Sequence, residues 1–215
     1  MLKLIIGNKN YSSWSLRPWL LLQHFGVVFE EVRIPLDTPE FQTKIGNWSP
    51  SRKVPVLHDD SLVVWDSLAI CEYVNDRYLD GRGWPVDVNA RAVARSAACE
   101  MHSGFPALRA QLPMNCRRQV KAKHWDAAAD RDIERVIQLW RELRSAVDQQ
   151  TNFLCGPFSI VDAMFAPVVL RFRSYGVATD AVCERYMNAI LALPSMQTWL
   201  AQAINESERL AYENI

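Results

Sequence analysis

The sequence lacks the features that mark several common classes of protein. Its five cysteines are odd in number, widely spaced and without a Cys-x-x-Cys pair, so neither a disulfide framework nor a redox dithiol is expected. Its four histidines show no spacing typical of a metal site, and we expect no metal. Together these absences favour a reducing, cytoplasmic compartment.

An excess of charge of one sign is also missing. The 24 basic and 24 acidic side chains give a formal net charge of +0, which supports neither a nucleic-acid nor a membrane-surface partner. No apolar run approaches the length of a membrane span, and the first residues lack the pattern of a signal peptide. With 49% apolar and 22% charged residues in a chain of 215, we expect an ordinary globular protein of one large or two small domains.

What is present begins with a hairpin pattern. Apolar runs at 54–57 and 62–65 flank a polar turn, which predicts two antiparallel strands. Pro55 cannot donate to a sheet ladder, so it belongs at an edge, at a strand's start or at a cis bond. A cis Val54–Pro55 bond would free the backbone of Val54 to pair outside the sheet, whereas a trans bond is the commoner form.

A helix is expected directly after the hairpin. Apolar residues from Leu68 onwards fall on one helical face, and Asp66 and Ser67 stand at the cap positions. The free N–H groups and positive dipole end of such a helix suit a carboxylate ligand. Ordinary helix capping explains the same two residues.

The order Val-Pro, hairpin, Asp-Ser and helix resembles the glutathione-binding half of the glutathione S-transferase family. The resemblance implies that Val54, before a cis Pro55, pairs its backbone with the cysteinyl part of glutathione, the expected co-substrate. It implies that Asp66 and Ser67 hold the γ-glutamyl end, although Asp66 stands where relatives commonly have Glu or Gln. Lys53 would meet the glycyl carboxylate; a solvated lysine at a strand's start is the alternative.

The residues before the hairpin predict the rest of a small α/β domain. We expect a strand at 2–6, a helix capped by Ser15 with Pro18 in its first turn, a strand at 27–34 and a short helix at 40–45. A strand–helix–strand order implies a right-handed crossover and a parallel pair. The complete β-α-β-α-β-β-α order is similar to the thioredoxin-like first domain of the family, with a mixed four-stranded sheet.

The loop before the first helix sharpens the resemblance. Residues 12–17 are similar to the Ser-Ser-Cys-Ser-x-Arg signature of the zeta class, which includes maleylacetoacetate isomerases, with Trp14 in place of the cysteine. The resemblance implies that Ser12 or Ser13 contacts the glutathione sulfur. A hydroxyl bonded to sulfur, near a helix N-terminus, favours the charged form of a thiol whose ordinary pKa is about 8.5. Serine is also simply a turn former.

The second half of the chain is expected to be all helical. Glycines and a proline within 81–87 predict a linker between a first domain, 1–80, and a second, 88–215. Ser159 and Asp162 form a capping-box pattern that matches a folding motif of the family's second domain. Helical patterns occupy the ranges 88–109, 126–149, 160–175, 181–193 and 195–205.

By family analogy the helical domain supplies a pocket for the electrophile, facing the Ser12 loop. The candidates are Arg17, His102, Phe105, Arg109 and Met114, and each of them taken singly is also explained as ordinary core or surface. For Arg17 two roles remain open: anchoring its helix to the second domain, or pointing into the cleft.

Three functions are compatible with the sequence. The leading one is a transferase that conjugates the glutathione thiolate to small apolar electrophiles. The second is a zeta-type cis-trans isomerase acting on a conjugated diacid, which needs cationic groups such as Arg17 and Arg109. The third is a non-catalytic family member used for binding or assembly. The resemblance also implies a homodimer.

Overall fold

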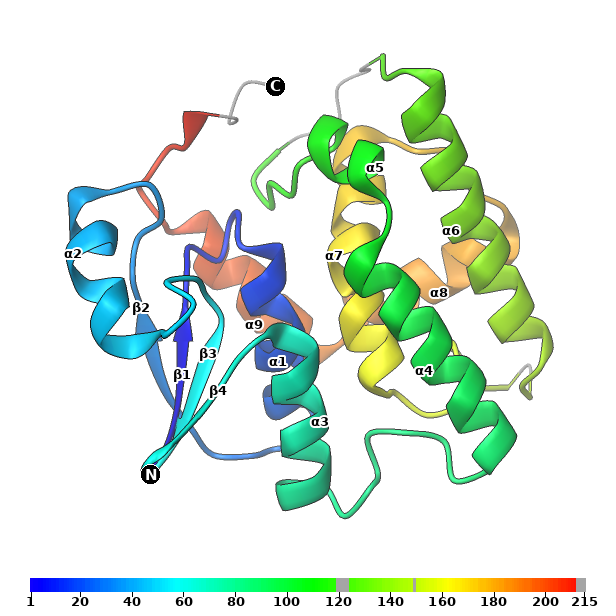
Figure 1. The fold of residues 1–215 in the computed structure, drawn as a ribbon. Coiled ribbons are helices and arrows are strands. Elements are labelled where there is room, and N and C mark those ends of the chain that lie inside the picture. The colour runs from blue at the N-terminus through cyan, green and yellow to red at the C-terminus, as the bar shows by residue number, and fades with distance from the viewer. Residues whose placement is uncertain (119–123, 149, 212–215) are drawn as a thin grey trace.

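The computed structural model describes residues 1–118, 124–148 and 150–211, which fall into an α/β half and a helical half (Figure 1). The α/β half has the predicted order of elements, and the fold class is confirmed. It consists of β1 (Leu2–Ile6), α1 (Ser13–His24), β2 (Glu30–Arg33), α2 (Pro39–Trp48), β3 (Val56–Asp59), β4 (Leu62–Val64) and α3 (Ser67–Tyr78).

The four strands form one mixed sheet in the order β2-β1-β3-β4. β1 and β2 are parallel, with Lys3 opposite Glu30, as the crossover predicted. β3 pairs antiparallel with both β1 and β4, which confirms the hairpin. The Val54–Pro55 bond before β3 is cis, the first of the two alternatives, and the Trp65–Asp66 bond is cis as well.

Alternation along β1 divides the core between the two faces of the sheet. Leu4 and Ile6 belong to the large cluster that includes residues of α1 and α3, whereas Ile5 packs in a small cluster with Val56 and with Ile45 of α2. Successive side chains of a strand point to opposite faces, so α1 and α3 cover one face and α2 the other (Figure 1).

The helical half is built around its central helix. It contains α4 (Val88–Ser103), α5 (Pro106–Gln111), α6 (Ala127–Ser145), α7 (Ile160–Tyr175), α8 (Ala181–Ala192) and α9 (Pro194–Ile204). All residues of α7 except Arg173 are buried, and α7 packs against α1 and α4. The predicted capping box is present, because the N–H and hydroxyl of Ser159 donate to Asp162 Oδ2 at 2.9 and 3.0 Å.

The start of α1 was predicted wrongly. The helix begins at Ser13 with Ser12 as its cap, not at Ser15, because the Ser12 hydroxyl accepts from the N–H of Ser15 at 3.4 Å. The Ser15 hydroxyl instead accepts from the N–H of Gly7 at 3.1 Å. Pro18 therefore lies inside the helix, where the hydrogen bond it cannot donate is the one to residue 14.

The range 88–109 contains two helices rather than one. Gly104 and Phe105 separate α4 from α5, and Phe105 has a left-handed backbone with φ of 61° just before Pro106. Other boundaries shift by a few residues: β2 is shorter than 27–34, α2 is longer than 40–45, and α6 ends at Ser145. We predicted that α6 ends at Gln149, which lies outside the described residues.

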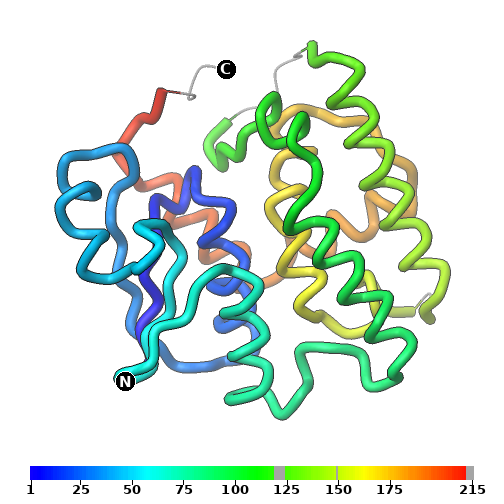
Figure 2. Tube along the Cα trace, viewed as in Figure 1, coloured from blue at the N-terminus to red at the C-terminus, as the bar shows by residue number. Residues whose placement is uncertain are grey.

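After α9 the chain returns to the α/β half (Figure 2). The segment from Glu206 to Leu210 lies against the loop that follows β1, as hydrogen bonds to Lys9 and Tyr11 show. Between α3 and α4, residues 79–87 form turns, and the predicted division of the chain at 81–87 stays a prediction. Within the described part of the chain, no helix is long and apolar enough to cross a membrane.

Candidate functional site

Two adjoining cavities lie at the junction of the two halves. The larger, about 590 Å³, lies where the loop before α1 faces α5 and α7. The smaller, about 350 Å³, lies beside the cis Val54–Pro55 bond and the start of α3. Trp14, Lys53 and Val54 line both cavities, so a ligand bound in the smaller one could extend into the larger.

Most of the predicted site residues line these cavities. Ser12, Ser13 and Arg109 line the larger cavity. The residues predicted to bind glutathione line the smaller one, and two of them, Lys53 and Val54, line both. The nine that line one or both are Ser12, Ser13, Lys53, Val54, Pro55, Asp66, Ser67, Arg109 and Met114. Arg17, His102 and Phe105, which we predicted for the electrophile pocket, are not among the residues that line either cavity.

The two serines differ in their hydrogen bonds. The Ser12 hydroxyl donates to Ser15 Oγ at 2.7 Å, which commits its hydrogen within the protein. The Ser13 hydroxyl accepts from Nη2 of Arg171 at 3.3 Å, so its own hydrogen can still be donated to a ligand. A nearby guanidinium also favours negative charge next to Ser13.

Asp66 uses both carboxylate oxygens at the start of α3. Oδ1 accepts from the N–H of Leu68 at 3.1 Å and thereby caps the helix. Oδ2 accepts from Nε2 of His102, on α4, at 2.9 Å. His102, which was predicted for the electrophile pocket, therefore orients Asp66 instead, and the carboxylate remains half-exposed toward the smaller cavity.

Arg17 is buried inside the protein and lines neither cavity. Its side chain is fully buried, with the guanidinium carbon 4.2 Å from the centre of the Trp14 ring and Nη1 donating to Ser67 Oγ at 3.4 Å. Burial, and the cations of Arg109 and Arg171, lower the pKa of Arg17 to about 9. Trp14 lies in the same helix as Arg17, and Ser67 lies in α3, so these contacts do not show the anchoring to the second domain, which stays a prediction.

Arg109 and Phe105 have different positions at the break between α4 and α5. Arg109 lines the larger cavity, stacks 5.0 Å from the centre of the Trp14 ring, and donates to the carbonyls of Gly104 and Met101. Phe105 is 5% exposed and belongs to the core, so its predicted contact with an electrophile is not supported by its position.

Comparison with known proteins agrees with this geometry. Residues 11–77 match the family model described as "Glutathione S-transferase, N-terminal domain", and residues 126–202 match "Glutathione S-transferase, C-terminal domain". The two matches together cover more than half of the chain. The chain belongs to the glutathione S-transferase family.

Individual members of the family are distant from this chain. A probable maleylacetoacetate isomerase of Caenorhabditis elegans is 33% identical over 96 residues, 45% of this chain and 44% of that protein. Glutathione S-transferase 1 of Manduca sexta is 33% identical over 98 residues, 40% of this chain and 45% of that protein. The matched stretch thus spans less than half the length of either relative.

A solved structure shows the same fold over almost the whole length. A glutathione transferase homolog from Burkholderia (BGR1), with bound glutathione, superposes with a TM-score of 0.72 and 24% identity. The match covers 95% of this chain and 98% of that one. At this identity the likeness shows the fold alone and not the role of any residue.

Sequence reasoning missed Arg171, which belongs to this candidate site. It is 5% exposed, lines the larger cavity, and donates to the carbonyl of Leu112 at 2.5 Å besides Ser13. No local pattern marks it, because it lies far along the chain from Ser13, in the middle of α7. Arg52 and Tyr11 also line the larger cavity and were not predicted.

No cysteine thiol belongs to the lining of the site. All five cysteines are free, and none of them lines either cavity. Burial raises the pKa of Cys116 and of Cys155 to about 12, so both thiols stay protonated near neutral pH. Among the described residues no group of three or more Cys, His, Asp or Glu is placed to hold a metal ion.

Proposed function

We propose that this protein is a glutathione-dependent transferase that binds glutathione in the smaller cavity and activates its thiol where the two cavities meet. The single observation that carries the proposal is their shared lining, Trp14, Lys53 and Val54, which joins the serine loop to the start of α3. Glutathione-bound structures of the same fold, such as the Burkholderia homolog, support glutathione as the ligand.

In this proposal each part of glutathione meets a suitable group. The backbone of Val54 precedes β3, which starts at Val56, and offers an N–H and a C=O to the cysteinyl part. Asp66 and Ser67, with the N-terminus of α3, receive the γ-glutamyl ammonium and carboxylate. Lys53 receives the glycyl carboxylate.

The chemistry that follows is conjugation. A hydroxyl of Ser13 or Ser12 donates to the sulfur and stabilises the thiolate. The thiolate attacks an electrophilic carbon held in the larger cavity, a C–S bond forms, and the leaving group departs with its electron pair. The free hydrogen of Ser13 favours it over Ser12 in this arrangement.

The decisive experiment is the ultraviolet thiolate absorbance of bound glutathione across pH, for the wild type, Ser12→Ala and Ser13→Ala. We expect a bound-thiol pKa well below that of free glutathione, restored toward it in Ser13→Ala more than in Ser12→Ala. Binding with no lowered pKa would favour the non-catalytic binding or assembly role. No binding at all would overturn the proposal.

A second candidate is the cis-trans isomerase of a conjugated diacid. The observation that favours it is the cationic lining of the larger cavity, to which Arg52, Lys53, Arg109 and Arg171 contribute. We predicted Arg17 as one of the cations that pair with the diacid, but Arg17 is buried. In this candidate function Arg171 takes that role instead.

The two reactions can be separated by one substitution. Arg52→Gln removes a cation that a substrate carboxylate would pair with, and a lost charge-assisted bond of this kind should lower isomerisation of a cis-diacid about tenfold. Conjugation of a neutral aromatic halide needs no such cation and should stay within about threefold of the wild type. Both reactions are assayed with glutathione, and equal effects on the two would remove this candidate.

The remaining parts of the proposal concern the whole protein. We propose a homodimer in the cytoplasm, with a glutathione-binding domain at 1–80 and a helical domain at 88–215. The free cysteines support a reducing compartment. Sedimentation equilibrium over a range of protein concentrations tests the dimer, and a mass equal to one chain at every concentration would exclude it.

A further inference from the structure

The loop between β1 and α1 is buried although it has no partner strand. It carries Ser12 at its end, and Asn8, Lys9 and Asn10 within it are each at most 3% exposed. The carbonyl of Asn8 accepts from the N–H of Ser12 at 2.8 Å, which closes the loop on itself. The N–H groups of Lys9 and Asn10 point the other way and need acceptors from elsewhere.

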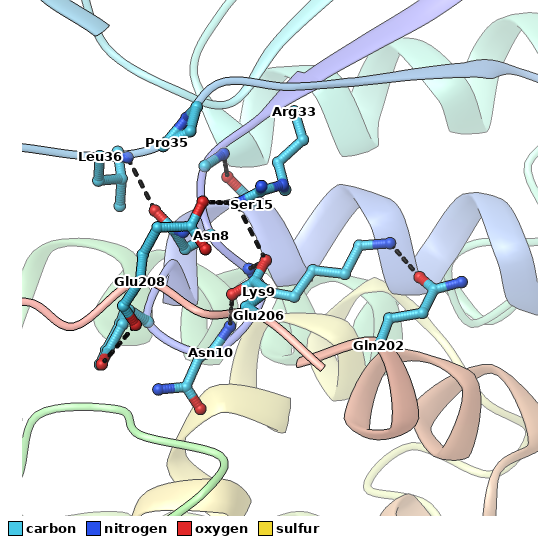
Figure 3. Close-up of polar contacts among 12 residues, drawn as sticks. Asn8, Lys9, Asn10, Ser15, Arg33, Pro35, Leu36, Gln202, Glu206 and Glu208 are labelled. Carbon is cyan, nitrogen blue, oxygen red and sulfur yellow. Dashed lines mark hydrogen bonds and ion pairs between the residues drawn. The ribbon is translucent and has the colours of Figure 1, made fainter. Parts of the chain in front are cut away.

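Glu206 supplies both acceptors. Its Oε1 accepts from the N–H of Lys9 at 2.7 Å, and its Oε2 accepts from the N–H of Asn10 at 3.0 Å (Figure 3). The Glu206 side chain is 7% exposed, so these are buried, charge-assisted hydrogen bonds. A carboxylate with one oxygen on each of two successive N–H groups fixes the peptide plane between them.

The residues after Glu206 continue the contact toward the larger cavity. We call residues 206–210 the C-terminal strap. The carbonyl of Glu208 accepts from the Tyr11 hydroxyl at 3.4 Å and from Nη2 of Arg117 at 2.8 Å. The N–H of Leu210 donates to the Tyr11 hydroxyl at 3.4 Å. Tyr11 lines the larger cavity next to Ser12, so the strap holds the loop from Lys9 as far as the cavity wall.

The side chain of Lys9 also holds the loop in place. Its Nζ donates to Gln202 on α9 (Figure 3). The same Nζ donates to Glu31 Oε2 at 2.6 Å and lies 4.8 Å from the centre of the Trp19 ring. Both sides of the same residue, backbone and side chain, are thus held by the end of the chain. The loop position therefore depends on α9 and the strap.

We propose that Glu206 is a positioning residue for the thiol site, which acts by holding the Lys9–Asn10 peptide so that the hydroxyl of Ser13 or Ser12 reaches the glutathione sulfur. This inference rests on the proposed function. Glu206 is not among the residues lining either cavity, so it acts through the loop and not on the ligand. A hydroxyl stabilises a thiolate only within hydrogen-bond distance, so a small shift of the loop removes the effect.

The test compares Glu206→Gln with Glu208→Gln. Glutamine at 206 keeps one acceptor oxygen and turns an NH₂ group toward the other backbone N–H. The Glu208 side chain pairs with Arg33 at 2.8 Å, so Glu208→Gln removes a charge from the strap and leaves the two loop bonds in place. The readouts are the pKa of the bound glutathione thiol and the dissociation constant of glutathione.

We expect Glu206→Gln to raise the pKa of the bound thiol by about one unit and to lower kcat/KM near pH 6.5 about tenfold. Glutathione affinity should stay within about threefold, and Glu208→Gln should match the wild type in every readout. A merely structural role would lower the melting temperature and leave the thiol pKa unchanged. That result, or equal shifts in both variants, would overturn the inference.

A measurement on the unsubstituted protein keeps the inference testable where Glu206→Gln does not fold. Saturating glutathione should slow amide hydrogen exchange at Lys9 and Asn10, because the bound thiolate and the strap favour the same loop position. Unchanged exchange at both amides would overturn the inference. The proposed function fails separately, when the wild type binds glutathione without a lowered thiol pKa or does not bind it.

Discussion

Trp14 is the side chain around which the candidate site is arranged. The guanidinium carbons of Arg17 and Arg109 lie 4.2 and 5.0 Å from the centre of its ring, and the ring of His102 meets it edge-on with centroids 5.2 Å apart. A cation over an indole face is attracted by the ring's quadrupole, so Trp14 accommodates two arginines that would otherwise repel. Trp14, which stands where the zeta signature has a cysteine, thus stabilises the neighbouring guanidinium groups of Arg17 and Arg109.

Asp66 allows charge and capping to be tested separately. Asp66→Asn keeps a good N-cap for α3 but removes the charge that we propose pairs with the γ-glutamyl ammonium. We expect glutathione binding to weaken by about 1.5–3 kcal/mol through the lost charge-assisted bond, measured by titration calorimetry. Asp87→Asn, at the cap of α4, is the matched control and should bind as the wild type does. Wild-type affinity in Asp66→Asn would remove Asp66 from the site.

The residues of the site differ in how far the sequence could predict them. Lys53, Val54, Asp66 and Ser67 come from one continuous stretch, whose strand, turn and cap signals place them near one another. Arg171 reaches the same site only through the packing of α7 against α1, which no local pattern encodes. The partnership of His102 with Asp66 likewise depends on how α4 lies beside α3.

At the scale of elements, the capping box of α7 makes a prediction about pH. Burial raises the pKa of Asp162 to about 6, against the hydrogen bonds from Leu154 and Ser159 that lower it. Between about pH 4 and 6 the folded protein keeps a proton that the unfolded chain has lost, so stability falls as pH rises through this window. Asp162→Ala removes both the capping hydrogen bonds and the carboxyl group that titrates. Its loss of stability in urea unfolding should therefore be greatest near pH 4 and smaller by up to about 3 kcal/mol above pH 6.

The cap of α8 provides a control of opposite sign. The N–H of Cys183 donates to Asp180 and, with other contacts, holds its pKa below the ordinary value. Asp180 therefore contributes stability above about pH 4 and loses that contribution as pH falls. The cost of Asp180→Ala should shrink toward low pH while that of Asp162→Ala grows. Parallel pH profiles for the two variants would contradict the raised pKa of Asp162.

The break between α4 and α5 depends on a close backbone contact at Gly104. A Cβ at this position would lie 2.7 Å from the carbonyl oxygen of Glu100, which is backbone and cannot swing away. We expect Gly104→Ala to cost about 1–3 kcal/mol of stability, measured by urea unfolding. At Gly26 a Cβ would meet nothing within 4 Å and only the φ of +68° is unfavourable, so Gly26→Ala should cost about 1 kcal/mol. A smaller loss at Gly104 than at Gly26 would be inconsistent with the contact.

Elements with a strong period and a clear cap were predicted well. α7 follows its capping box, and β1 has the predicted bounds, because both are largely buried and their apolar runs are nearly unbroken. The start of α1 was missed because three serines compete for the cap, and the choice falls to Ser12 once Ser15 binds Gly7. We predicted a single helix over 88–109 because nothing in the sequence indicates the left-handed backbone that Phe105 adopts.

At the scale of the whole molecule, the two halves share one core. The large hydrophobic cluster runs without interruption from Leu4 of β1 through Leu16 of α1 to Phe165 of α7 and Trp199 of α9. Helix α1 packs against α3 on one side and against α7 and α9 on the other. Neither half can therefore unfold without exposing apolar surface of the other, and the strap adds polar contacts across the same boundary.

This shared core predicts a single cooperative unfolding transition. Calorimetric and van't Hoff enthalpies of unfolding should agree, and a destabilising substitution in the helical half should also destabilise the sheet. Met164→Ala, at a fully buried position of α7, should cost about 2–5 kcal/mol and speed amide exchange at Leu4 and Ile6 by the corresponding factor. Independent halves would leave those β1 amides unchanged. Unaltered exchange in β1, or two resolved melting transitions, would mean that the halves fold separately and meet only at the site.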